Sequence, residues 1–164
     1  MTLKNDTIMT TVEQKIKSIV DKIEGATYIF DDWATANHRL NRMPLPAVVN
    51  VLPASGVFHI GNTQLKDYPN CMLAFIDKAE IDKDGTENDQ VVERCKNMAR
   101  EFLLLLNQSR LFAPVSGNIP YSIIYDRLDV NVTGVVIELR LEELKGLVLC
   151  YGKSVKETVY GRSE

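Results

Sequence analysis

One long helical pattern between two groups of strand patterns constrains the fold of this chain most. Apolar side chains keep a helical period across residues 88–109: Val91, Val92, Cys95, Met98, Ala99, Phe102, Leu103, Leu105 and Leu106. The apolar stripe is broad, so we expect this helix to lie against a sheet. Strand patterns come in runs before and after it instead of alternating with helices, which favours an α+β fold. We predict a mixed, mostly antiparallel sheet with two main helices packed on one face and a C-terminal β-hairpin.

The second main helix is predicted over residues 12–24. Its apolar positions fall on one face: Val12, Ile16, Ile19, Val20 and Ile23. Thr10 and Glu13 have the spacing of a capping box at its start, and Gly25 stands where a glycine commonly ends a helix.

Strand patterns account for most of the remaining apolar residues. We predict strands over 27–31, 47–52, 57–60 and 70–77, a hairpin with arms 121–128 and 135–142, and a short strand within 146–151. Residues 32–42 are expected to form a polar connection. Pro44, Pro46 and Pro53 bracket the second strand, which favours a short strand or one at a sheet edge.

The length of 164 residues fits a single domain, here predicted over residues 10–152. Residues 1–9 are expected to form a flexible leader and residues 153–164 a polar, frayed C-terminal tail. Nineteen basic and 22 acidic side chains give a net charge of −3, and a general nucleic-acid binder usually carries a positive excess. Composition therefore disfavours that class.

The three cysteines, Cys71, Cys95 and Cys150, lie among apolar neighbours and form no C-x-x-C pair. We expect reduced, buried thiols instead of a metal site or a disulfide framework. The N-terminal segment lacks the apolar region of a signal peptide, and no apolar run is long enough to span a membrane. These features predict a cytoplasmic location.

The histidines and the acidic loop give no reaction. His38 and His59 lie in different segments, and no G-x-S-x-G motif accompanies them. The acidic residues Asp82, Asp84, Glu87 and Asp89 fail the EF-hand register, because Gly85 stands fourth instead of sixth. We expect a solvated loop there, with Asn88 or Asp89 as N-cap of the long helix.

No glycine-rich phosphate-binding motif is present. The basic residues of segment 38–42 form a candidate contact patch within a loop: His38, Arg39 and Arg42. We predict no catalytic, cofactor-binding or metal-binding residue, and no cofactor.

The order and length of the elements resemble the small α+β proteins of tailed bacteriophages that act as tail terminators or in head–tail completion. The matching parts span residues 10–145: 12–24, 47–52, 71–76, 91–107 and 121–142. The resemblance implies a non-enzymatic structural protein of tail assembly in a phage or prophage. Such proteins form a ring, commonly a hexamer, at the head-proximal end of the tail tube.

The expected partners are further copies of the chain, the tail-tube proteins and the head–tail connector proteins, with no membrane and no specific nucleic acid. The resemblance implies a location in the host bacterial cytoplasm during assembly and then in the virion tail. A closed ring needs two different patches on each subunit. We expect residues 31–70 to supply an intersubunit or tube-contacting arm, and the three prolines to shape a selective sheet edge.

Two other functions remain open at this point. The first is a small cytoplasmic ligand-binding or enzymatic α+β domain with a pocket between sheet and helices, lined by Tyr28, Trp33, His59, Tyr121 and Tyr125. The second is a DNA-associated factor, which would bind duplex DNA in a salt-dependent way.

Overall fold

A computed structural model describes residues 11–79, 86–127, 132–149 and 152–161. The elements, in chain order, are α1 Val12–Val20, β1 Thr27–Asp31, α2 Trp33–Leu40, β2 Ala47–Val51, β3 Ser55–Ile60, β4 Gln64–Lys78, α3 Thr86–Ser109, β5 Tyr121–Arg127, β6 Val132–Arg140, β7 Leu147–Val148 and α4 Val155–Tyr160. The predicted leader, Cys150 and residues 82–85 of the acidic loop lie outside the described residues.

The sheet is mixed and mostly antiparallel, which confirms the predicted α+β class. Its order is β1-β2-β4-β6-β5, and β3 and β7 pair with β4 off this path. β1 and β2 run parallel, and the other pairs are antiparallel. β5 and β6 form the predicted C-terminal hairpin, although β6 begins at Val132, within the predicted connection. Val132 and Thr133 are buried and pair with β4, so burial extends the strand beyond its alternating part.

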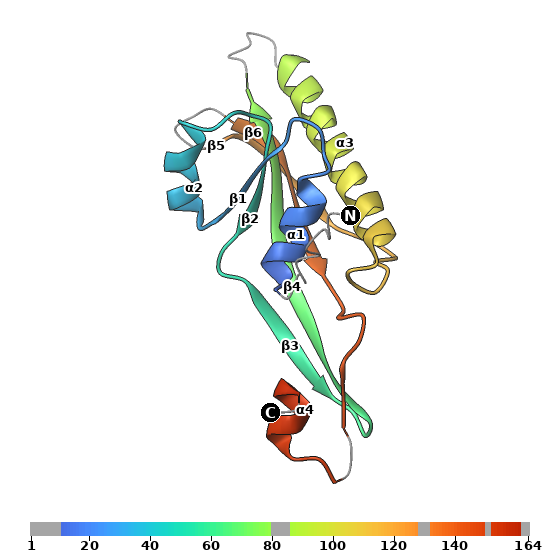
Figure 1. Cartoon of the computed structure of the whole chain (residues 1–164). Coiled ribbons are helices and arrows are strands. Elements are labelled where there is room, and N and C mark those ends of the chain that lie inside the picture. Colours follow the sequence, from blue (N-terminus) through green and yellow to red (C-terminus); the bar gives the residue numbers. More distant parts are fainter. Residues whose placement is uncertain (1–10, 80–85, 128–131, 150–151, 162–164) are drawn as a thin grey trace, which may run out of the picture.

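α1 and α3 pack on one face of the sheet, as predicted, and α2 covers the other (Figure 1). Alternate residues of β4 divide between the two cores. Phe75 packs against Phe102 of α3 with ring centroids 5.7 Å apart, and Ile76 belongs to the core on the α2 side. The strand is therefore covered on both faces, which explains its nearly continuous apolar run.

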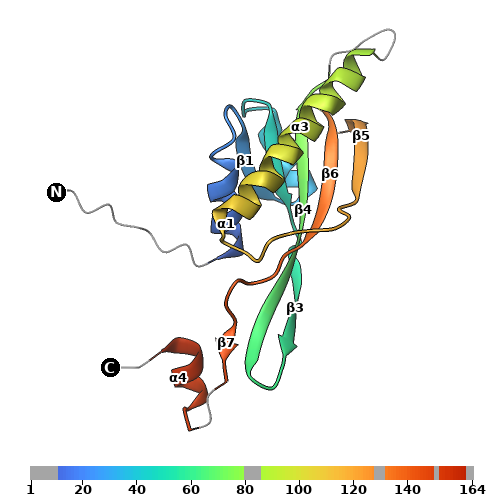
Figure 2. The same cartoon turned by 90° about the vertical axis from the view of Figure 1, so that its right-hand side faces the viewer.

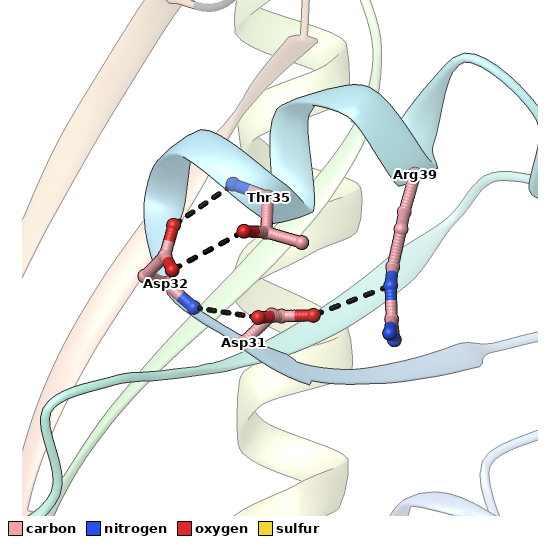
Figure 3. A network of polar contacts seen from close by, with 4 residues as sticks. All are labelled: Asp31, Asp32, Thr35 and Arg39. Atoms are coloured by element: carbon pink, nitrogen blue, oxygen red, sulfur yellow. Dashed lines mark hydrogen bonds and ion pairs between the residues drawn. The ribbon is translucent and has the colours of Figure 1, made fainter.

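α2 lies where the sequence predicts a polar connection. Asp32 is its N-cap: one carboxylate oxygen accepts the backbone N–H of Thr35 at 2.8 Å, and the other accepts the Thr35 hydroxyl at 3.2 Å (Figure 3). The hydrogen bond from the backbone N–H of Thr35 stabilises the charged carboxylate and so holds the pKa of Asp32 below its usual value. Arg39 forms an ion pair with Asp31 at 3.2 Å. Ala36 and Leu40 are buried, so the helix contributes a narrow apolar stripe.

α1 begins at Val12, as predicted, but its N-cap and the start of α3 differ from the predictions. Thr11, not Thr10, is the N-cap of α1. The backbone N–H of Gln14 donates a hydrogen bond to the Thr11 hydroxyl, and the backbone N–H of Thr11 donates one to the Gln14 side-chain oxygen. α3 begins at Thr86, so Asn88 lies inside its first turn and is not an N-cap; the same holds for Asp89. These predictions were wrong because several capping residues stand side by side in each segment.

α1 also ends earlier than predicted, at Val20, where Asp21 is the C-cap. Gly25 has a φ of +77°, but it lies in the turn that follows and does not end the helix itself. Ile23 is buried in this turn, which explains why the apolar period continues past the last helical residue.

β2 is short, as expected, but it is not an edge strand. It pairs with β1 on one side and β4 on the other, and all five of its residues are buried. Pro46 precedes the strand and Pro53 follows it, so neither occupies a position that must donate to the ladder. The expectation that the prolines shape a sheet edge was therefore wrong.

β4 is nearly twice as long as predicted, because it runs through Pro69 and the polar residues before it. Residues 65–70 of β4 pair with β3 and residues 70–78 pair with β6. Asn70 pairs with both strands, so they lie on opposite sides of β4, and Pro69 stands opposite Gly56 just before the pairing with β6 begins. β3 and the first half of β4 form a hairpin that projects beyond the part of the sheet covered by α1 and α3 (Figure 2).

β7 confirms the short strand predicted within residues 146–151. Residues 155–160, expected to fray, form α4, where Ser154 and Glu157 make a capping box. In the described part of the chain, no helix is long and apolar enough to cross a membrane.

Candidate assembly surface

The projecting hairpin exposes large apolar side chains. Every residue of β3 is exposed, with Phe58 at 72%, Ile60 at 69% and Val57 at 49% of full accessibility. We call these three residues the hairpin surface. Single exposed apolar side chains are ordinary, but a group of them on one projecting element is typical of a contact with another protein.

Contacts at its base hold the hairpin to the chain segment after β6. The backbone N–H of Asp67 donates to the Glu143 carboxylate at 3.0 Å, and the backbone N–H of Glu143 donates to the Asp67 carbonyl at 2.9 Å. Lys66 and Glu142 form an ion pair at 2.9 Å. At Gly146 a Cβ atom would lie 2.5 Å from the Leu65 carbonyl oxygen, so only glycine allows this close approach. The hairpin is thus fastened on a second side in addition to its own ladder.

A groove of about 430 Å³ lies between the hairpin and the N-terminal turn of α1. Phe30 and Phe58 contribute aromatic walls, and its two charged lining residues, Glu13 and Asp67, are both acidic. Phe58 and Asp67 are cross-strand partners and therefore lie side by side on one face of the hairpin. This face combines an exposed aromatic ring with negative charge.

A second apolar surface lies along β5, which pairs only with β6 among the described strands and ends the path of the sheet. Tyr121, Ile123 and Tyr125 are between 39% and 55% exposed, and we call them the β5 surface. Lys96 of α3 lies over the Tyr121 ring, with its Nζ atom 5.2 Å from the centroid. Cation–π attraction of this kind fixes the ring beside the helix.

A hollow of about 100 Å³ separates α3 from β5 beside Tyr121. Its apolar lining includes Leu103, Ile119 and Tyr121, and its two charged residues, Lys96 and Arg100, are both basic. The hairpin and the β5 region therefore carry opposite charge next to exposed apolar side chains.

The five residues predicted to line one pocket are not brought together. Tyr28 packs into the core beneath α1 and α3, whereas Trp33 packs into the core on the α2 side. His59 is exposed on the hairpin, edge-on to Tyr68 at 6.4 Å. Tyr121 and Tyr125 lie on β5.

The candidate basic patch lies at the end of α2 and not in a loop. His38, Arg39 and Arg42 line one hollow together. Among the described residues, no group of three or more His, Cys, Asp or Glu is arranged to hold a metal ion.

Burial of Cys71 and Cys95 confirms the prediction for these two thiols. Burial raises the pKa of each to about 12, which keeps both in the unreactive thiol form at neutral pH.

The sequence prediction missed Phe58 and Asp67 as surface residues. Residues 57–60 were correctly predicted as a strand, but a run of apolar residues commonly indicates burial on both faces. The available signal was the polar stretch 61–68, because it provides no apolar partner to cover the strand.

Comparison with known proteins gave no relative from which a function can be inferred: no protein-family model, no curated protein and no solved structure matches the chain.

Proposed function

We propose that the protein is a non-enzymatic subunit of phage tail assembly, which forms a ring at the head-proximal end of the tail tube as tail terminators do. The observation that carries the proposal is the pair of distinct exposed apolar surfaces, one on the projecting hairpin and one along β5. A ring subunit joins its neighbours head to tail and so needs two different patches, whereas a two-fold dimer uses one patch twice.

The position of the hairpin also supports the proposal. The segment 31–70, expected to provide a contacting arm, contains all of β3 and the start of β4. The arm projects from the core and is fastened at its base by Lys66, Asp67 and the segment after β6. A preorganised arm loses little conformational entropy on binding, which favours assembly.

The test is binding to tail tubes assembled from the tube protein of the same phage or prophage. We expect the purified chain to sediment with the tubes and to appear at one tube end in negative-stain electron microscopy. Light scattering after size exclusion should give the mass of several protomers for the released material. Absence from the tubes at every concentration tested would contradict the proposal.

A variant identifies the contacting surface in the same assay. Phe58→Ser removes the most exposed apolar side chain of the hairpin surface and should reduce tube binding or ring formation. Tyr160→Ser is the matched control, because Tyr160 is an aromatic residue on α4 that is at least as exposed as Phe58 and belongs to neither the hairpin surface nor the β5 surface. Equal losses in the two variants would show that the hairpin has no special part in assembly.

A further inference from the structure

Phe58 and Asp67 together form a charged apolar knob on the hairpin. They are directly opposed in the β3–β4 ladder, so the ring and the carboxylate lie next to each other. The backbone of Asp67 is held by Glu143, but its carboxylate makes no hydrogen bond or ion pair within the part of the chain that the structure describes. The other charged residue that lines its groove is Glu13, which has the same sign.

The hollow beside β5 is the complementary feature. Leu103, Ile119 and Tyr121 contribute to its apolar lining, and Lys96 and Arg100 contribute two cations. Lys96 is held by Glu93 at 3.0 Å. Arg100 donates through Nη1 to the Asn97 side chain at 2.5 Å and lies 3.8 Å from Glu93, but its side chain remains 61% exposed. The exposed part of the Arg100 guanidinium is therefore the cation that can reach a neighbouring molecule.

We propose that Phe58 of one copy docks into the α3–β5 hollow of the next copy, where Asp67 pairs with Arg100. This inference rests on the proposed ring function and names the contact that forms the ring. The occupant is a second copy of this chain. Its apolar Phe58 ring suits the apolar lining of the hollow, and its Asp67 carboxylate has the charge opposite to that of Arg100. A two-fold contact between the Asp67 faces of two hairpins would instead bring like carboxylates together, which repulsion opposes.

Charge-swap variants test this pairing. Asp67→Arg places like charges against Arg100 of the neighbour, and Arg100→Asp does the same to Asp67. Each single change should raise the dissociation constant for self-association at least tenfold. The double variant Asp67→Arg/Arg100→Asp restores opposite charges in every head-to-tail contact and should return to within a few-fold of the wild type.

The measurement is sedimentation velocity over a concentration series at low salt, with circular dichroism to verify the fold of each variant. Lys156→Glu on exposed α4 is the control reversal and should have no effect. If Asp67→Arg does not fold, Asp67→Asn and Phe58→Ser replace it, and each should weaken association on its own.

Three results would overturn the inference. The first is that the single variants associate like the wild type. The second is that the double variant associates no better than the single variants. The third is that the wild-type chain stays monomeric or forms a two-fold dimer through its hairpins. Binding to tail tubes is measured separately. A wild-type chain that binds tubes without this contact would refute the docking arrangement and leave the proposed function standing, whereas a chain that self-associates as expected but ignores tubes would refute the proposed function.

Discussion

Lys66 and Glu142 lie 76 positions apart in the sequence, yet their side chains form an ion pair at 2.9 Å at the base of the projecting hairpin. Glu142 follows β6, which belongs to the helix-covered sheet, whereas Lys66 belongs to the hairpin itself. The pair therefore connects the core to the arm that is proposed to make contacts, and the Glu142 carboxylate raises the pKa of Lys66.

Glu142→Gln should loosen the hairpin without unfolding the core. The variant removes the charge that holds Lys66 while retaining a side chain of similar size. Amide hydrogen exchange followed by mass spectrometry should show faster exchange in residues 55–67 and unchanged protection in α3. Asp21→Asn, which breaks an exposed pair with Lys17 on α1, is the control and should leave hairpin exchange unaltered. Unchanged exchange in both variants would mean that the backbone ladder alone holds the arm.

Gly134→Ala should be one of the more damaging single substitutions in the chain. A Cβ atom at this position of β6 would lie 2.0 Å from the Phe75 carbonyl oxygen, and backbone cannot move aside as a flexible side chain can. We expect a loss of about 3 kcal/mol in the free energy of unfolding, at the upper end of overpacking effects. Urea denaturation followed by circular dichroism measures it.

Gly61→Ala is the matched control for this substitution. Its Cβ atom would be 3.5 Å from its nearest neighbour, the Gln64 carbonyl oxygen, which is an ordinary contact distance. The stability should change by less than about 0.5 kcal/mol. Similar losses at the two positions would contradict the steric explanation.

Elements with a strong apolar period were predictable from the sequence, and elements held by a few contacts were not. The period of α3 predicted both its existence and its place on the sheet, because nine apolar positions define one face. α2 has only Ala36 and Leu40 buried, and half of its eight residues are polar, so its sequence shows no clear apolar stripe. Its N-cap Asp32 was visible, but a capping residue without an apolar stripe does not distinguish a helix from a turn.

The candidate surface depends on long-range arrangement, which local patterns do not specify. The strand at residues 57–60 was predictable, but its exposure follows from the length of β4 beyond the helices. The polar composition of residues 64–68 hides that extension, because both faces of the hairpin contact solvent and no alternation is required. Strand register places Asp67 beside Phe58, and the packing of α3 against β5 places Lys96 and Arg100 beside Tyr121. Neither arrangement can be read from a short stretch of sequence.

Cys71 and Cys95 should be protected from thiol reagents in the folded protein. Burial raises the pKa of each to about 12, so the reactive thiolate is scarce at pH 8. In a Cys150→Ser background, which removes the third thiol, Ellman's reagent should react slowly in buffer and with two thiols in 6 M guanidinium. Fast reaction of either thiol in buffer would contradict the burial.

The same thiols make stability depend on alkaline pH. A raised pKa in the folded state means that their contribution is complete below the unfolded pKa near 9 and is lost as the pH rises from there toward 12. The urea midpoint should therefore fall between pH 8 and pH 10. A double Cys→Ala variant should show a shallower fall, and an equal fall would assign the effect to other groups.

Tyr28 and Asn50 provide a further, separable alkaline effect. The Asn50 amide donates to the Tyr28 hydroxyl at 3.2 Å, and burial raises the pKa of Tyr28 well above its usual value of 10.0. The folded state thus favours the neutral phenol, so stability is fully present below pH 10 and declines above it. Tyr28→Phe should flatten this decline while lowering stability at pH 7 by about 1 kcal/mol, because the buried amide loses its acceptor. Tyr125→Phe on exposed β5 is the control and should leave stability at pH 7 unchanged. A Tyr28→Phe variant that matches the wild type at pH 7 and declines as steeply above pH 10 would show that this hydrogen bond does not couple β1 to β2.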